Sequence, residues 1–156
     1  MSILTVKNIS KQFPGTLALD NVSVEFEGGK VHALVGKNGS GKSTLLKILS
    51  GAQPPTSGSF YLDNREMKFS STSDAFKNGI ATVYQELSLI PGLSVAENIL
   101  IGRMPKKFGL IDYKKAESTV RDLLGELEID RPANVPVSSL SMWQRQMVEI
   151  AKAMSF

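Results

Sequence analysis

The sequence contains no cysteine, which excludes disulfides, thiolate metal sites and cysteine nucleophiles. It contains no apolar run of the ~18 residues that a membrane-spanning helix needs, and residues 1–7 lack the long apolar core of a signal peptide. Eighteen basic residues against fifteen acidic ones give a net charge of only +3, which is too weak to indicate a nucleic-acid partner. A role at a membrane would therefore require a partner protein.

The composition is ordinary for a globular protein. The chain has 156 residues, of which 42% are hydrophobic and 21% charged. This length fits one domain or part of one and is sufficient to bury a core.

The most informative segment lies at residues 36–43. It fits the phosphate-binding pattern G-x-x-x-x-G-K-[ST] at every fixed position. The pattern predicts a curled backbone whose N–H groups point at an anion, and the helix that follows adds partial positive charge. Lys42 is expected to reach the β- and γ-phosphates, and Ser43 to offer its hydroxyl to Mg²⁺. The predicted nucleotide-binding residues of this segment are Gly36, Asn38, Gly39, Ser40, Gly41, Lys42, Ser43 and Thr44.

The first half of the chain has the pattern of an α/β fold. Alternation over residues 3–27 predicts two strands, and residues 57–69 predict a hairpin that turns at Asp63 and Asn64. The apolar runs at residues 31–35 and 80–84 predict buried strands, and residues 73–79 a short helix.

The second half is predicted to be mainly helical. Ser94 and Glu97 predict a capping box for a helix through Ile101. Residues 112–129 predict an amphipathic helix, and Ser141 opens a final helix with an apolar stripe. The expected stripe consists of Met147, Val148, Ile150, Ala151 and Met154.

In these segments the chain resembles the ATP-binding subunits of ABC transporters, and especially those of importers for ribose, galactose, xylose and related sugars. The resemblance depends on residues 13–19, 31–51, 79–99 and 140–153. It implies a P-loop α/β fold of the ABC ATPase type, with an antiparallel β arm and a helical subdomain. Residues 1–93 would form the nucleotide-binding core and residues 94–156 the helical subdomain.

The resemblance also implies individual roles. Phe13 matches the aromatic residue that stacks on adenine, although packing in the core is an alternative. Gln85 matches the glutamine that contacts Mg²⁺ and the attacking water. Ser141 and Gln144 match the signature Leu-Ser-Gly-Gly-Gln, which binds the γ-phosphate held by a second ATPase domain in a head-to-tail dimer.

The signature departs from the family pattern at Met142 and Trp143. An indole in place of glycine impedes the close approach of backbone to phosphate. Ser141 and Gln144 also fit an ordinary capping box. Lys37 is expected to be an exposed lysine, and His32 a packed strand residue without a catalytic role.

No apolar strand followed by paired acids occurs in the sequence. In the family such a strand supplies an aspartate for Mg²⁺ and a glutamate that activates water, and a positioned base typically contributes ~10²–10⁴ in rate. The expectation is a C-terminally incomplete ATPase domain that binds ATP and Mg²⁺ without efficient turnover. The alternative is a non-hydrolytic nucleotide-binding or assembly module. GTPases, small-molecule kinases and DNA-repair ABC ATPases fit less well, because no Asn-Lys-x-Asp motif and no sustained heptad run is present.

The expected partners are a second ATPase domain, transmembrane permease subunits and, indirectly, a periplasmic or extracellular sugar-binding protein. The implied location is the cytoplasmic side of the cell membrane. The sequence does not specify which sugar would be carried.

Overall fold

The computed structural model describes residues 3–84, 87–130 and 132–155, and the chain forms two compact units, residues 1–80 and 81–156. The predicted boundary at residues 93–94 separates a nucleotide-binding core from a helical subdomain by function, and it stays a prediction. No described helix has both the length and the hydropathy required to span a membrane.

The first unit is built on an antiparallel sheet of strand order β2-β1-β3-β4. Its strands are β1 (Ile3–Phe13), β2 (Thr16–Glu27), β3 (Ser57–Leu62) and β4 (Arg65–Met67). A tight turn through Pro14 and Gly15 joins β1 to β2, with Phe13 paired to Thr16. Asp63 and Asn64 both have positive φ at the β3–β4 turn, as expected for a two-residue hairpin loop. The two strands predicted over residues 3–27 and the hairpin predicted over residues 57–69 are confirmed.

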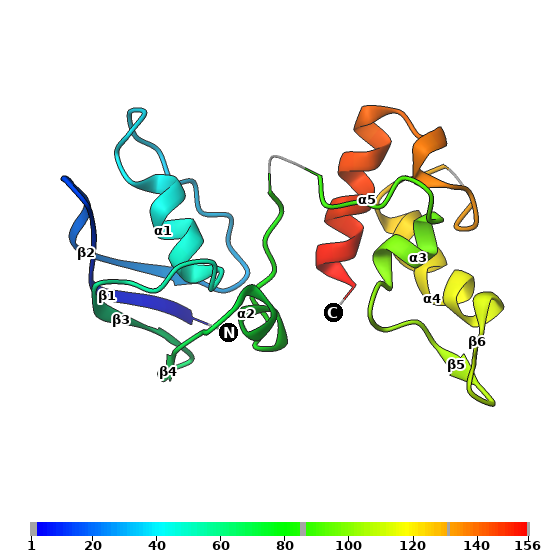
Figure 1. The fold of residues 1–156 in the computed structure, drawn as a ribbon, viewed down its shortest axis with the longest axis horizontal. Helices are drawn as coiled ribbons and strands as arrows, with labels where there is room; N and C mark the ends of the chain where they lie inside the picture. The colour runs from blue at the N-terminus through cyan, green and yellow to red at the C-terminus, as the bar shows by residue number, and fades with distance from the viewer. Residues whose placement is uncertain (1–2, 85–86, 131, 156) are drawn as a thin grey trace. The chain divides into compact units, whose positions relative to one another are not determined.

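One helix covers a face of this sheet (Figure 1). Helix α1 (Lys42–Leu49) contributes Leu45, Ile48 and Leu49 to the buried core. They pack with side chains from all four strands: Val6, Ile9, Leu19, Phe60 and Met67. This apolar face fixes α1 on the sheet, and helix α2 (Thr72–Lys77), capped by Ser71, follows the sheet in the chain.

Two strand predictions are wrong. Residues 31–35 and 80–84 form no described strand, and neither segment belongs to the four-stranded sheet. Val31 is 101% exposed and Val35 is 89% exposed. An extended segment becomes a strand only when a neighbour satisfies its backbone N–H and C=O groups, and no such pairing occurs within the described ranges.

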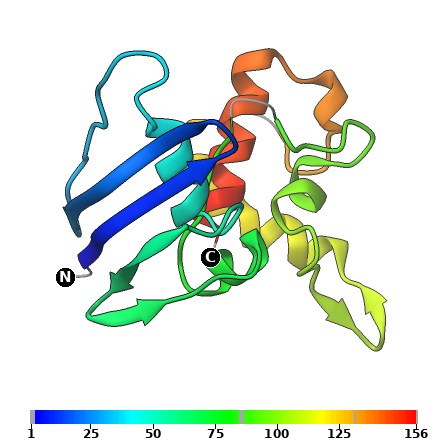
Figure 2. The same cartoon turned by 60° about the vertical axis from the view of Figure 1, so that its left-hand side comes forward.

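The second unit is a small helical bundle with a short hairpin (Figure 2). It contains α3 (Val95–Ile99), β5 (Lys106–Lys107), β6 (Leu110–Ile111), α4 (Tyr113–Glu126), a 3₁₀ turn (Val137–Ser139) and α5 (Met142–Met154). Its core joins Ile99 of α3, Val120 and Leu124 of α4, and Val148 and Ala151 of α5. The capping box of Ser94 and Glu97 is confirmed, although α3 ends at Ile99 rather than Ile101.

The apolar stripe of α5 is only partly confirmed. Val148 and Ala151 are fully buried, but Met154 is 52% exposed. Glu149 is buried instead. Its Oε1 accepts a hydrogen bond from Ser88 Oγ at 2.5 Å, whereas its Oε2 is buried with no hydrogen-bond partner among the described residues.

Candidate functional site

The phosphate-loop segment meets helix α1 at Gly41, which is the N-cap residue of α1 and has a φ of 90°. A Cβ atom at this position would lie 2.5 Å from the carbonyl oxygen of Ala18 and 2.7 Å from Leu19 Cδ2. Only glycine fits both the left-handed backbone and this close approach to β2. The end of the loop is therefore seated directly on the sheet.

The start of α1 is open to a ligand. No side chain caps the helix, and its first turn has no acidic residue. The first N–H groups of any helix lack intrahelical partners, and the helix dipole makes that end partly positive. The absence of a side-chain cap leaves this end suited to an anion.

Lys42 holds the loop in a curl. Its Nζ donates hydrogen bonds to the carbonyl oxygens of Gly36 and Lys37, both at 2.8 Å. Ser40 N donates to the Lys37 carbonyl at 3.2 Å. A Cβ atom at Gly36 would lie 2.7 Å from Ser40 Oγ. The ammonium group thus lies inside the loop, where phosphate oxygens can replace the two carbonyls as its partners.

The other predicted loop residues surround this curl. Asn38 and Gly39 are exposed in the turn, and Ser43 and Thr44 stand in the first helical turn, exposed and half-buried respectively. Oxygen ligands are those that Mg²⁺ prefers, so the Ser43 hydroxyl fits the predicted metal. No group of three or more His, Cys, Asp or Glu side chains within the described ranges could hold a metal ion. A cation here would depend on phosphate oxygens for most of its ligands.

Phe13 lies at the end of β1, half-buried, with Lys11 Nζ 5.4 Å from its ring centroid. The hairpin that carries Phe13 also supplies Ala18 and Leu19, which contact the end of the loop. One hairpin therefore positions the predicted adenine platform and the phosphate loop. The remaining exposed ring surface is compatible with stacking.

Three further predictions have different outcomes. Gln85 lies outside the described residues. Lys37 is exposed, as expected. His32 is exposed and lies outside any strand, which corrects the prediction of a packed strand residue. Its Nε2 lies within hydrogen-bond distance of the backbone N and O of Glu27, and its ring meets Phe26 edge-on.

Ser141 and Gln144 form a closed capping box at the start of α5. Ser141 N donates to Gln144 Oε1 at 3.0 Å, and Gln144 N donates to Ser141 Oγ at 3.3 Å. Both side chains are thus occupied by the backbone of their own helix. The capping role is confirmed by geometry, and the phosphate-binding role stays a prediction.

The two departures from the family signature are both exposed, Met142 at 64% and Trp143 at 56%. Behind them, Arg145 fixes the turn that leads into α5. Its guanidinium donates to the carbonyl oxygens of Val137, Leu140 and Ser138 at 3.2, 3.1 and 2.9 Å. Sequence reasoning missed this clamp, since an arginine in a helix is ordinarily solvated.

Two polar networks of the second unit were also missed. Asn98 is fully buried, accepts from Ile90 N at 2.7 Å and donates to the carbonyl oxygens of Ile90, Leu93 and Ser94. Ser88 Oγ accepts from Lys152 Nζ at 2.8 Å while it donates to Glu149. The two networks fix the chain between residues 88 and 98. The sequence signal for the first network was Asn98, a polar residue at an otherwise apolar position of α3.

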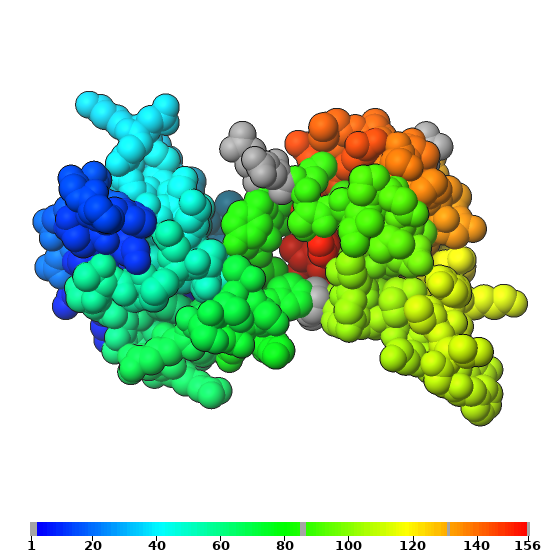
Figure 3. Space-filling view, in the orientation of Figure 1, coloured from blue at the N-terminus to red at the C-terminus, as the bar shows by residue number. Residues whose placement is uncertain are grey.

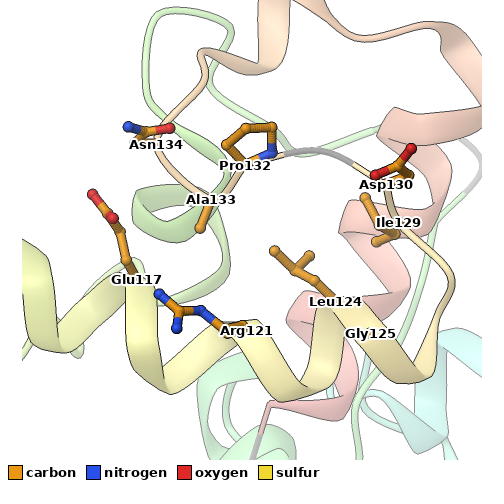
Figure 4. A pocket seen from close by; sticks show the side chains of 9 residues that line it. All are labelled: Glu117, Arg121, Leu124, Gly125, Ile129, Asp130, Pro132, Ala133 and Asn134. Atoms are coloured by element: carbon orange, nitrogen blue, oxygen red, sulfur yellow. The ribbon is translucent and has the colours of Figure 1, made fainter.

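A pocket of about 500 Å³ lies between α4 and residues 129–130 and 132–134 (Figure 4). Glu117 and Arg121 line it from α4, and Pro132, Ala133 and Asn134 line it from the loop. None of the predicted site residues lines this pocket, so it is separate from the phosphate loop.

Comparison with known proteins identifies the family to which the chain is similar. Residues 19–155 match the family model described as ABC transporter. The chain is 50% identical over 153 residues to the arabinose import ATP-binding protein of Rhizobium etli, which covers 98% of this chain and 30% of that protein. It is 47% identical over 152 residues to a ribose import ATP-binding protein of Rubrobacter xylanophilus, and this match covers 97% of this chain and 30% of the relative. The chain thus spans about 30% of the length of these curated relatives.

Solved structures extend the comparison to the fold. An ATP-binding cassette of an ABC transporter, solved in its ADP conformation, superposes with a TM-score of 0.83 at 30% identity, over 99% of this chain and 65% of the cassette. A dimeric bacterial ABC transporter cassette gives 0.78 at 29% identity, over 97% of this chain and 69% of that cassette. The predicted ABC ATPase fold class is confirmed, and this chain belongs to the ABC transporter family of ATP-binding proteins.

Proposed function

We propose that this chain binds ATP with Mg²⁺ and serves as the energy-coupling, ATP-binding part of an ABC importer for sugars. The observation that carries the proposal is the uncapped start of α1, with the Lys42 ammonium held inside a curled loop. The relatives named for arabinose and ribose import support the sugar class. They leave open which sugar is carried, because solute choice belongs to other subunits.

Each site residue has a proposed task. The loop amides of residues 36–44 bind the phosphates, Lys42 neutralises the β- and γ-phosphate oxygens, and Phe13 stacks on adenine. Ser43 and Gln85 hold Mg²⁺. Ser141 and Gln144 face the γ-phosphate of a second ATPase domain in a head-to-tail dimer. We also propose permease subunits as partners, at the cytoplasmic side of the membrane, with a sugar-binding protein acting through them.

The direct test is a titration of the chain with fluorescent ATP in Mg²⁺. Lys42→Ala removes a charge-assisted contact of about 1.5–3 kcal/mol, so we expect affinity to fall by roughly ten-fold to a hundred-fold. Lys47→Ala is the matched control, since Lys47 is an exposed lysine in the last turn of the same helix. Equal affinity for Lys42→Ala and the unsubstituted chain would contradict the proposal.

We infer further that the 156-residue chain turns ATP over poorly, because no apolar strand with paired acids occurs in it. A second candidate function follows, namely a binding or assembly module in which nucleotide is a structural ligand. The exposed indole of Trp143 beside a closed capping box favours it. Steady-state phosphate release tests the module directly, since robust Lys42-dependent turnover would eliminate it, whereas weak turnover is expected of both functions.

A further inference from the structure

The β5–β6 hairpin of the second unit carries side chains that the proposed nucleotide site does not use. Two residues, Phe108 and Gly109, connect its short strands. The hairpin projects from its unit just before α4 begins, as the yellow-green protrusion at the lower right of Figure 3. Its apolar side chains face solvent: Phe108 is 96% exposed and Leu110 is 76% exposed. Ile111 and Tyr113 are also exposed.

Phe108 occupies a conformation that does not suit it. Its φ is 52°, in the left-handed region where a bulky side chain is unfavourable. Asparagine or glycine would fit this turn position better. Lys107 Nζ lies 5.9 Å from the centroid of the Phe108 ring. A strained aromatic residue that is this exposed nevertheless adds little to the packing of its own unit, so its presence points to an external contact.

The same segment is strongly basic. Residues 106–115 contain four lysines, Lys106, Lys107, Lys114 and Lys115, against the single acid Asp112. Asp112 is occupied as the N-cap of α4, where its carboxylate accepts from Lys115 N at 2.9 Å. None of the four lysines makes an ion pair within the part of the chain that the structure describes.

Two of these lysines stand where the helix field opposes them. Lys114 and Lys115 lie in the first turn of α4, which has no acidic residue. Cations at a helix N-terminus are unfavourable because that end is already partly positive. The Asp112 cap offsets part of this field, so the turn at Phe108 is the place where the local sequence is suboptimal for folding. An anionic partner with an apolar interior would favour both the exposed ring and the lysines.

We propose that the β5–β6 hairpin, together with the first turn of α4, docks on the surface of an anionic phospholipid bilayer. Lysines would contact lipid phosphates and carboxylates while Phe108 and Leu110 enter the boundary between headgroups and acyl chains. A nucleic acid would satisfy the lysines but would leave the aliphatic side chains of Leu110 and Ile111 in water. The proposal is independent of nucleotide binding, so it can fail without affecting the proposed function.

The test is flotation of the full chain, without nucleotide, with vesicles of phosphatidylcholine that either contain or lack phosphatidylserine. We expect binding to the vesicles with phosphatidylserine only, weakening as salt rises. Phe108→Asn removes the apolar tip and suits the turn, so the fold is retained while vesicle affinity falls at least about ten-fold. Lys106→Gln with Lys107→Gln should weaken affinity roughly twenty-five-fold, since each lysine near an anionic surface contributes about five-fold.

The matched control is Lys47→Gln with Lys77→Gln, which makes the same change in net charge on exposed lysines of the first unit. This variant should bind vesicles within about two-fold of the unsubstituted chain, because the charges it removes lie outside the hairpin. Circular dichroism confirms that each variant is folded. Equal affinity for both vesicle types, no loss with Phe108→Asn, or lysine-dependent binding to polyuridylate without vesicle binding would each overturn the proposal.

Discussion

The starts of α1 and α5 differ in what occupies their first backbone N–H groups. Helix α1 begins at a glycine with positive φ and has no side-chain cap. Helix α5 begins at Ser141, whose hydroxyl and main chain are both engaged by Gln144. The first start is ready for an anion, whereas the second must exchange its own hydrogen bonds before it can bind one. The comparison teaches that a segment can match a phosphate-binding pattern while its own side chains occupy the N–H groups that a phosphate would need.

The largest expected effect comes from Gly41→Ala. A methyl group there meets the Ala18 carbonyl at 2.5 Å and requires a φ of 90°. Overpacking and left-handed strain together should lower the free energy of unfolding of the first unit by about 2–4 kcal/mol. Urea denaturation, monitored by circular dichroism, measures this loss in the free energy of unfolding.

Gly125→Ala is the control in the second unit. Gly125 lies in α4 with ordinary φ. Apart from its chain neighbours and the nearby backbone of its own helix, no described heavy atom lies within 4 Å of the place that an alanine methyl group would take. Alanine should raise stability by about 0.5–1 kcal/mol. A stable Gly41→Ala protein with unchanged nucleotide affinity would contradict the seating of the loop on β2.

The next effect concerns Asn98→Ala in the second unit. This change removes the fully buried amide that joins the backbone of Ile90, Leu93 and Ser94 through four hydrogen bonds. Loss of these bonds should lower the free energy of unfolding by about 2–3 kcal/mol. Thermal unfolding measures the loss, and Asn78→Ala, at an exposed asparagine, should cost much less.

A smaller effect distinguishes the two helix starts directly. Ser141→Ala removes a capping hydroxyl and should destabilise α5 by about 1 kcal/mol. Ser43→Ala at the start of α1 removes no cap and should leave stability within about 0.5 kcal/mol of the original. Chemical denaturation of both variants measures the two stability losses. Equal losses would contradict the conclusion that α5 has a side-chain cap and α1 has none.

The smallest effect depends on pH. The side-chain and backbone hydrogen bonds from Ser94 hold the pKa of Glu97 below its ordinary value of 4.5. A lowered pKa in the folded state stabilises the fold above pH 4.5, and this contribution disappears as pH falls through the folded value. Ser94→Ala should therefore show a flatter dependence of stability on pH below 4.5. An unchanged slope in acid denaturation would contradict this assignment.

The sequence was sufficient for features that depend on local chemistry. The hairpin turn at Asp63 and Asn64, the capping box of Ser94 and Glu97, and the loop before α1 all depend on residues close together in the chain. The strands expected at residues 31–35 and 80–84 depend on distant neighbours, and apolar composition alone does not supply hydrogen-bond partners. Arg145 and Asn98 were missed because their partners are backbone carbonyls, which no sequence pattern displays.

The most direct test of the central claim follows backbone amide resonances by NMR while MgATP is added to the chain. We predict large shifts at Gly39, Gly41, Lys42 and Ser43, because these amides would bind the phosphates. At concentrations where the chain is monomeric we predict small shifts at Ser141 and Gln144, because the phosphate proposed for them belongs to a second domain. Lys42→Ala should suppress the loop shifts. Unmoved loop amides, or shifts confined to the start of α5, would contradict the account.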